Sequence, residues 1–324
     1  MASITVPAGS HQPSNLRPLS IFRDLPAVAD LIELCFSSTM DTEGKRYIQD
    51  MRRAGSDGSF LKWANKAAES TSLPLTGYVW EENDRIIGNV SLVPFRQKKH
   101  RVYLIANIAV HPDFRQQGIA RALTVQAMKH GRDRKADAIW LHVRDDNPHA
   151  IDLYQKLGFV EQARRTTWQA TAESHAPVLQ TDIRIVPRHA DFWPMQQRWL
   201  AHLYPDLLAW HRNWSFNSLR PGFWNWLYLI FVDMNIRQWA AVKGNMPEAV
   251  LAWIPYGRGE SLFAATSEER DPDALVALLL HARRELSRLH PHIIMEFPAG
   301  KLDGAIQSAG FRALRTLIWM KATS

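Results

Sequence analysis

The spacing of hydrophobic and polar residues changes repeatedly along the first half of the chain. Between Leu25 and Cys35, apolar residues return three and four positions apart, and this period predicts a helix over Leu25–Cys35. Other stretches are strand-like or extended, and they are Leu16–Phe22, Gly77–Trp80, Arg85–Val93, Val102–Val110, Ala138–Val143 and Val160–Ala170. Strands and helices in alternation predict an α/β fold.

Glycine, proline and asparagine mark the ends of the other predicted helices. A glycine-containing loop after residue 110 leads into a helix that we expect to continue to about His130 and to stop at Gly131. Asn147 and Pro148 supply an N-cap and a first-turn proline for a further helix. Gly158 closes that helix.

The second half of the chain repeats the order of the first. An ungapped alignment at an offset of 152 residues places Leu157–Phe159 on Ala309–Phe311. Trp168 aligns within one residue of Trp319. Internal repetition at this scale predicts two copies of one domain. The expected parts are a disordered tail over 1–14, a first domain over 15–172 and a second domain over 181–324.

Composition fits two globular domains. The 324 residues are about two domains long, and 46% hydrophobic with 22% charged residues is ordinary usage. No apolar run reaches the ~18 residues that a membrane helix needs, and the polar N-terminus does not resemble a secretory signal. We therefore expect no membrane partner.

One cysteine and a scattered positive charge narrow the chemistry. Cys35 is the only cysteine, which excludes an internal disulfide and a multi-cysteine metal site, and we expect a buried, inert thiol in a cytoplasmic protein without a metal. The formal charge is +7, but lysine and arginine form no long run. The charge therefore favours a surface that attracts a polyanionic cofactor over a nucleic-acid partner.

The segment Val110–Leu123 carries the pattern of a phosphate-binding loop. An apolar strand ends, Arg115-x-x-Gly118-x-Ala120 follows, and an amphipathic helix begins at once. Amides at a helix N-terminus are unpaired and lie at the positive end of the helix dipole, where they can hold a pyrophosphate. The Gly-Lys-Ser/Thr ending of a Walker loop is absent, so this segment alone leaves a plain strand–turn–helix open.

A second motif lies about thirty residues further on, in the segment Val143–Phe159. Its residues Asn147, Ala150, Leu153-Tyr154, Lys156 and Gly158-Phe159 fit N-x-x-A-x-x-L-Y-x-K-x-G-F. With R/Q-x-x-G-x-G/A before it, this motif resembles the GCN5-related N-acetyltransferase (GNAT) family at every defined position. The resemblance implies tandem GNAT folds, each a mixed, mainly antiparallel sheet flanked by helices, with acetyl-CoA as the acyl donor substrate and a degenerate second copy.

The resemblance also implies roles for individual residues. Tyr154 is implied as the general acid for the leaving thiolate, with a packed aromatic as the structural alternative. Asn147 is implied to contact the cofactor arm, although a helix cap alone would explain it. The implied cofactor-binding residues are Ile108, Ala109, Val110, Arg115, Gln116, Gln117, Gly118, Ile119, Ala120, Arg121, Asn147, Tyr154 and Lys156.

The general base is left open by the sequence. Many relatives use a glutamate on the strand before the loop, but Val102–Val110 contains no carboxylate, and Asn107 cannot act as a base. Ordered water, His111 or His142 remain as alternatives, although we expect His111 in the turn after the strand and His142 in the sheet. Glu81 and Glu82 are expected in a solvent-facing turn.

In the second half the phosphate loop is replaced by Ala264–Leu275, which has no glycine and has four carboxylates near a helix start. At the 152-residue offset Tyr154 falls on Ile306 and Asn147 on Ala299. We therefore expect this half to bind no CoA. Its many tryptophans fit either an aromatic wall for an acceptor or packing, and they are Trp193, Trp199, Trp210, Trp214, Trp224, Trp226, Trp239 and Trp253.

Three functions remain open from the sequence. The first is direct transfer of an acetyl group from acetyl-CoA to a primary amine of a small molecule, and the second is transfer to a protein N-terminus or lysine. The third is a non-catalytic acetyl-CoA-binding sensor. The sequence names neither the small-molecule or peptide amine acceptor nor the oligomeric state.

Overall fold

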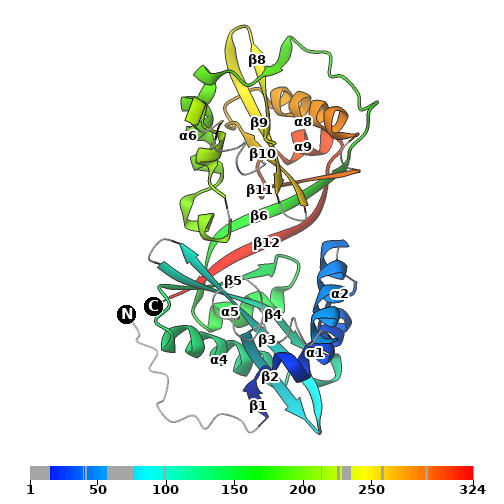
Figure 1. The fold of residues 1–324 in the computed structure, drawn as a ribbon, viewed down its shortest axis with the longest axis vertical. Helices are drawn as coiled ribbons and strands as arrows, with labels where there is room; N and C mark the ends of the chain where they lie inside the picture. The colour runs from blue at the N-terminus through cyan, green and yellow to red at the C-terminus, as the bar shows by residue number, and fades with distance from the viewer. Residues whose placement is uncertain are drawn as a thin grey trace. The chain divides into compact units, whose positions relative to one another are not determined.

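The structure is a computed structural model in which the chain forms two units, each with its own strands and helices (Figure 1). The first unit comprises Met1–His142, Asp152–Val160 and Lys321–Ser324, and the second comprises Val143–Ile151 and Glu161–Met320. The described residues are 15–38, 40, 42–56, 76–97, 100–212, 214–224, 227, 235–256, 259–288 and 291–323. The predicted tail 1–14 lies outside them.

The first unit is built on a mixed sheet in the order β1-β2-β3-β4-β5. Neighbouring strands are antiparallel from β1 to β4, and β4 and β5 are parallel. The strands are β1 (Leu16–Pro18), β2 (Thr76–Glu82), β3 (Arg85–Gln97), β4 (His100–Val110) and β5 (Ala138–Arg144). The strands predicted from the sequence over Gly77–Trp80, Arg85–Val93, Val102–Val110 and Ala138–Val143 are confirmed.

Helices cover both faces of this sheet (Figure 1). On one face, α1 (Ile21–Phe36) and α2 (Thr42–Ser56) enclose a core that reaches Val79 of β2. On the other face lies α4 (Ile119–Asp133), and a Cβ added to Gly88 of β3 would meet Ile119 and Leu123 at 3.0 Å. Two shorter helices follow along the chain, η1 (Pro112–Phe114) and α5 (Pro148–Lys156).

Two helix boundaries differ from the prediction. Ile21 and Phe22 are helical rather than extended, because the Ser20 amide donates to the Asp24 carboxylate (2.7 Å) and starts the helix directly after β1. Gly131 lies within α4 and does not end it. A Cβ there would come within 2.7 Å of the Ile139 side chain, so this glycine allows the helix to lie close to β5.

The second unit repeats this order of elements. Its strands are β7 (Ile183–Pro187), β8 (Arg237–Lys243), β9 (Met246–Tyr256), β10 (Gly259–Ala265) and β11 (His292–Pro298). They are antiparallel from β7 to β10, and β10 and β11 are parallel, as β4 and β5 are. The helices are η2 (Ala190–Phe192), α6 (Trp193–Leu203), η3 (Asp206–His211), η4 (Phe216–Leu219), α8 (Pro272–Leu286) and α9 (Asp303–Ser308). The predicted repetition of one fold is confirmed.

Two long strands change unit along their length. They are β6 (Phe159–Thr171) and β12 (Arg312–Ala322). Within the second unit β6 pairs antiparallel with β11, and within the first unit the Thr323 amide donates to the Gly158 carbonyl (2.9 Å) just beyond β12. The compact units are therefore not contiguous in sequence. The contiguous domains expected over 15–172 and 181–324 stay a prediction about folding units.

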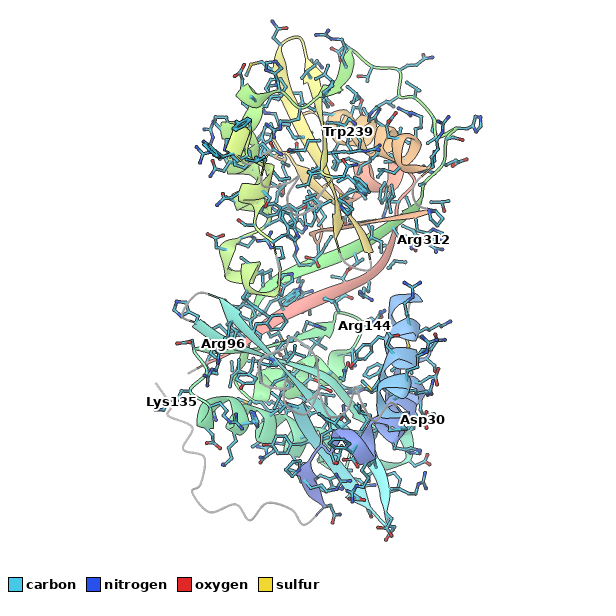
Figure 2. The ribbon with its side chains drawn as sticks, viewed as in Figure 1. Asp30, Arg96, Lys135, Arg144, Trp239 and Arg312 are labelled. Carbon is cyan, nitrogen blue, oxygen red and sulfur yellow. The ribbon has the colours of Figure 1, made fainter. Side chains whose placement is uncertain are left out.

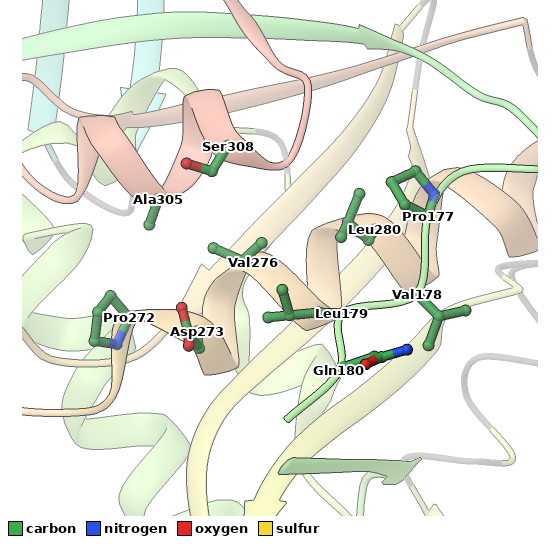
Figure 3. Close-up of a pocket in the computed structure, with 10 residues that line it drawn as sticks. All are labelled: Pro177, Val178, Leu179, Gln180, Pro272, Asp273, Val276, Leu280, Ala305 and Ser308. Carbon is green, nitrogen blue, oxygen red and sulfur yellow. The ribbon is translucent and has the colours of Figure 1, made fainter. Parts of the chain in front are cut away.

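The helix α8 packs between the sheet of the second unit and a chain segment that precedes β7. Trp239 of β8 meets His281 of α8 edge-on at 5.5 Å (Figure 2). On its other side, Arg284 donates to the Pro177 carbonyl (2.6 Å), and a cavity of about 510 Å³ lies between this segment, α8 and α9 (Figure 3). Its wall is mainly carbon, with Leu179 and Val276 among the lining residues, so it offers little reactive chemistry.

A buried carboxylate anchors the first strand and helix of the first unit. Asp24 is 1% exposed and receives hydrogen bonds from Arg17 (2.6 and 3.0 Å), from the Ser20 amide and from Arg23 (3.0 Å). Burial alone would raise the pKa of Asp24, but the bonds from Arg17, Ser20 and Arg23 outweigh burial and hold this pKa below its usual range. The Arg17 guanidinium also pairs with Glu81.

We expect Asp24→Asn to lower the free energy of unfolding by about 2 kcal/mol at pH 7, because it removes a charged acceptor of several hydrogen bonds. The folded-state pKa of Asp24 lies below the value of about 3.9 for a free aspartate. The difference from wild type is therefore full above about pH 5 and disappears as the pH falls through the folded-state pKa. Urea unfolding at several pH values measures it.

Asp30→Asn is the matched control, because Asp30 lies on the same helix, is 68% exposed and pairs with Arg52 at 2.7 Å (Figure 2). Its effect should stay within about 0.5 kcal/mol. Equal losses for the two variants would contradict the role given to the buried carboxylate.

Candidate cofactor and reaction site

The strands β4 and β5 separate at the edge of the sheet that faces the loop. Their parallel register runs from Val102↔Ala138 to Ile105↔Leu141 and includes no later pair, although both strands are described further along. The last residues of β4 therefore pair with β3 alone. This leaves one side of Ile108–Val110 free of a neighbouring strand within the first unit, as an extended ligand would require.

A β-bulge reshapes β4 at the point where it leaves β5. Its register against β3 shifts between Asn89 and Ser91, and Asn107 takes a left-handed backbone conformation with φ of 51°. Asparagine tolerates this conformation better than most residues. The Asn89 side chain is fully buried and donates to the Asn107 carbonyl (2.9 Å), which stabilises the bulge.

A neutral polar cluster surrounds this bulge. The Asn107 amide group donates to the Tyr47 hydroxyl (2.9 Å) of α2 and approaches the Ser91 hydroxyl (3.5 Å). Burial raises the pKa of Tyr47, and the bond from Asn107 lessens that rise. Sequence reasoning considered Asn107 but missed Tyr47, Asn89 and Ser91, because α2 is mostly polar and no motif marks these residues.

The loop after β4 delivers a set of unpaired backbone donors. The His111 amide donates to the Ile87 carbonyl (2.8 Å), and the chain then passes through η1 into α4. The amides from Gly118 to Arg121 have no acceptor among the described residues, and the first helical bond runs from the Ala122 amide to the Gly118 carbonyl (3.0 Å). These are the unpaired donors of a helix N-terminus, where an anion is favoured.

The backbone at Gly118 requires glycine and leaves open space. Its φ is 80°, and a Cβ added there would meet no protein atom within 4 Å. The first turn of α4 contains no acidic residue, and both Arg115 and Arg121 are exposed. Gln116 is also left-handed, with φ of 64°, so the chain turns sharply before the helix. The local charge and the open space both favour a phosphate group.

Tyr154 lies in α5 with its ring buried. It is 7% exposed, and its ring meets Phe159 edge-on at 6.2 Å. No described residue forms a hydrogen bond with its hydroxyl, and burial raises the pKa of Tyr154. The phenol therefore keeps its proton at neutral pH, as a proton donor must before the reaction. The ring packing expected from the alternative reading is present as well.

The other residues of the second motif have structural roles. The Asn147 side chain accepts from the Ala150 amide (3.2 Å) and caps α5, as predicted. Before it, Arg144 pairs with Asp146 (2.6 Å) at the end of β5 (Figure 2). Lys156 is exposed and pairs with Asp152 (2.7 Å) along the helix. Contacts of Asn147 and Lys156 with a cofactor stay a prediction.

Cys35 lies beside the end of β4. Its thiol donates to the Val110 carbonyl (3.3 Å), which also accepts from the Arg115 side chain (3.4 Å). Burial raises the pKa of the Cys35 thiol, and the nearby Arg115 only lessens the rise. Cys35 is half-buried rather than buried as expected, and its raised pKa makes the thiol a poor nucleophile. The Val110 carbonyl already has two protein donors.

The candidate bases lie in different settings. His111 accepts from the Asp113 amide (3.4 Å) in the turn, and His142 lies half-buried in β5. Glu81 lies within β2, where it pairs with Arg17 and Arg23, so the expectation that it lies in a turn is wrong. Among the described residues, no group of three or more His, Cys, Asp or Glu is placed to hold a metal ion.

The matching helix start in the second unit is already satisfied by the protein. The Asp271 carboxylate accepts from the Asp273 amide (3.0 Å) and pairs with Lys243 (3.2 Å), and Pro272 removes another amide. No glycine opens the backbone there. A negative cap of this kind repels a phosphate.

Most described tryptophans of the second unit pack against other rings or the core. Trp199, Trp210 and Trp253 are buried, whereas Trp224 is 79% exposed. Trp226 lies outside the described residues. No helix in the described part of the chain is long and apolar enough to span a membrane.

The segment that contains both sequence motifs is similar to a known protein family. The acetyltransferase (GNAT) family model matches residues 28–159. Over 69 residues the chain is 41% identical to a [ribosomal protein bS18]-alanine N-acetyltransferase of Salmonella typhimurium, covering 21% of this chain and 47% of that enzyme. Over 53 residues it is 45% identical to a mycothiol acetyltransferase of Paenarthrobacter aurescens, covering 16% of each. The matches thus span less than half of these relatives.

Solved structures match along nearly the whole chain. A GCN5-related N-acetyltransferase from Sphaerobacter thermophilus is 13% identical, covers 96% of each chain and gives a TM-score of 0.57. A tandem GNAT protein from the clavulanic acid biosynthesis pathway is 13% identical, covers 95% of this chain and 97% of that chain, and gives 0.52. At this identity the likeness shows the fold. The chain has the tandem GNAT fold, and its residues 28–159 match the GNAT acetyltransferase family.

Proposed function

We propose that the protein is an N-acetyltransferase that moves an acetyl group from acetyl-CoA directly to a primary amine. The observation that carries the proposal is the set of unpaired amides from Gly118 to Arg121, beside a strand that has separated from its neighbour. The amides would hold the pyrophosphate, with Gln116 and Gln117 in the turn before them and Arg115 nearby. The free side of Ile108–Val110 would pair with the pantetheine arm.

The proposed chemistry is a single displacement at the thioester. The amine nitrogen forms a bond to the carbonyl carbon, the C–S bond breaks, and Tyr154 gives its proton to the departing thiolate. Backbone amides near Ile108 would stabilise the charge that develops on the carbonyl oxygen. The amine loses a proton to solvent or to a base that stays unassigned. Cys35 is not needed as an acyl carrier, since its raised pKa keeps it a thiol.

The acceptor class is open between two amines. A small-molecule amine is the first candidate. The α-amine of a peptide or protein is the second, supported by 41% identity to an enzyme named for alanine of a ribosomal protein. A non-catalytic sensor remains the alternative if CoA binds without turnover on any amine. A cytoplasmic location is part of the proposal because it rests on the single cysteine.

Gly118→Ala should weaken CoA binding at least tenfold, because its methyl group would project into the open space above the amides and its φ of 80° strains an L-residue. Calorimetry with CoA measures the affinity. Gly300→Ala is the matched control: Gly300 has φ of 79°, nothing within 4 Å of its added Cβ, and a place in the second unit. If both variants bind CoA as wild type does, the assigned anion site is wrong.

Tyr154→Phe should lower kcat about a hundredfold and leave CoA affinity within twofold, because it removes only a proton donor from a packed ring. Thiol release from acetyl-CoA with a panel of primary amines gives the rate, and calorimetry gives the affinity. Unchanged turnover would remove Tyr154 from the mechanism while leaving the cofactor site intact.

CoA should bind with a stoichiometry of one per chain, because the Asp271 carboxylate occupies the helix start of the second unit. The same calorimetric titration reports this number. Two sites per chain, or one site that survives Gly118→Ala and disappears with a substitution at Asp271, would reverse the roles of the two units.

A further inference from the structure

The second unit contains a cluster of aromatic rings around two arginines. The rings of Tyr204, Trp214, Phe216 and Phe263 form a continuous set, with centroids from 4.7 to 5.7 Å apart. Tyr204 directly follows α6, and Phe263 belongs to β10. Trp214 lies just before η4, and Phe216 is its first residue. Only Tyr204 is fully buried, so the other three rings keep part of their surface accessible.

One of the arginines is fully partnered. Arg165 of β6 is 3% exposed, and its guanidinium bonds to the Glu296 carboxylate (3.0 Å) and to the Leu203 carbonyl (2.5 Å). It also lies over the Tyr204 ring, with 4.7 Å from Cζ to the centroid. Glu296 is therefore already neutralised within the cluster.

The other arginine, Arg212, is half-buried, and its side chain forms no ion pair or hydrogen bond with the residues that the structure describes. Its Cζ lies 4.3 Å from the Phe216 centroid, and its Nε and one Nη are enclosed without a hydrogen bond to any described residue. The carboxylates that act on it across space are Glu296, which is paired, and Asp206, which is exposed. Burial accordingly lowers the pKa of Arg212, although arginine keeps its charge.

Other groups in the cluster also lack partners. The Tyr204 hydroxyl and His211 Nδ1 are enclosed without a well-aligned hydrogen bond to any described residue, although the Ala264 backbone lies near Tyr204 and the Leu208 backbone near His211. Burial raises the pKa of Tyr204 to about 12 and lowers the pKa of His211, so the phenol is protonated and the imidazole neutral at pH 7. The Arg212 N–H groups can only donate, so the partner that they lack among the described residues is an acceptor.

The cluster lies in the second unit where the first unit carries α1, α2 and the end of β4. The segment between β7 and β8, which carries η3 and η4, corresponds to the segment between β1 and β2, which carries α1 and α2. Likewise β10 corresponds to β4. In the first unit these elements place Tyr47 beside the β4 bulge. The second unit thus keeps a concentration of side chains at this place although its helix start is closed.

We propose that the second unit binds a small ligand with a carboxylate on an aromatic or apolar body, through Arg212 and the rings beside it. One unpaired guanidinium matches one carboxylate, which accepts two of its N–H groups in the same plane. The accessible edges of Trp214 and Phe216 provide apolar contact for the body of the ligand. Phosphate alone would use the charge but not the rings.

The first arm of the test compares probes on the full chain. Phenylacetate, its neutral isostere phenylacetamide and inorganic phosphate are titrated by calorimetry, with changes in tryptophan fluorescence as a second readout. We expect saturable binding of phenylacetate at least tenfold tighter than that of either other probe. The proposal would be overturned by equal affinities for phenylacetate and phenylacetamide or by tighter binding of phosphate. It would also be overturned if phenylacetate showed no saturable binding below about 10 mM.

The second arm changes the arginine. Arg212→Gln should weaken phenylacetate binding at least tenfold while CoA affinity stays unchanged. The phenylacetate affinity of Arg212→Lys should lie between those of wild type and Arg212→Gln, because lysine keeps the charge but not the planar guanidinium. Arg237→Gln is the matched control, since Arg237 lies in the same unit over the Trp253 ring (5.6 Å). It should bind phenylacetate as wild type does. Equal losses in Arg212→Gln and Arg237→Gln would contradict the assigned site.

Stability without ligand separates this role from a structural one. Removal of an unpaired, half-buried charge should raise the melting temperature of Arg212→Gln by a few degrees, and wild type should gain stability from phenylacetate whereas the variant should not. The proposal would be overturned if Arg212→Gln were less stable than wild type without ligand and phenylacetate did not stabilise the wild type. Arg212 would then be a structural residue.

Discussion

The first unit depends on backbone donors that the protein does not satisfy. A helix start next to a β-strand normally finds a side chain for its amides, since unpaired buried donors are costly. Here Gly118 supplies no side chain, and the first turn of α4 contains no acid. The bulge at Asn107 adds to this by directing β4 away from β5. Both features lead to the same edge of the sheet, which is why they are best explained by one long ligand.

The second unit shows how little is needed to close such a site. It keeps the antiparallel and parallel strand pairing and the helix between β10 and β11. The difference is local: Asp271 caps the amide of Asp273, and Pro272 replaces one donor. A carboxylate within hydrogen-bond distance of the helix start does what a phosphate would do there. The strand pairing of the fold and an open helix start are therefore separable in this chain.

Local patterns predicted much of this structure, and failures occurred where long-range contacts decide. The strands around β2–β5, the cap at Asn147 and the inert Cys35 follow from neighbouring residues. Gly131 was expected to end the helix. The contact that explains this glycine, with the Ile139 side chain 2.7 Å from an added Cβ, involves a strand distant in sequence and leaves no local signal. The partners of the Asn107 bulge come from α2 and β3, and no spacing in the sequence joins them.

The aromatic segment of the second half shows that composition alone does not distinguish a ligand site from a packed core. Its composition fits both packing and ligand binding, because aromatic rings serve in both. Burial separates them in part, since Tyr204 is enclosed whereas Trp214, Phe216 and Phe263 keep accessible surface. Hydrogen bonding decides further: Arg165 finds Glu296, but Arg212 finds no acceptor among the described residues. Packing against Phe216 alone leaves the Arg212 N–H groups without an acceptor among the described residues, so Arg212 is better explained by a ligand than by the core.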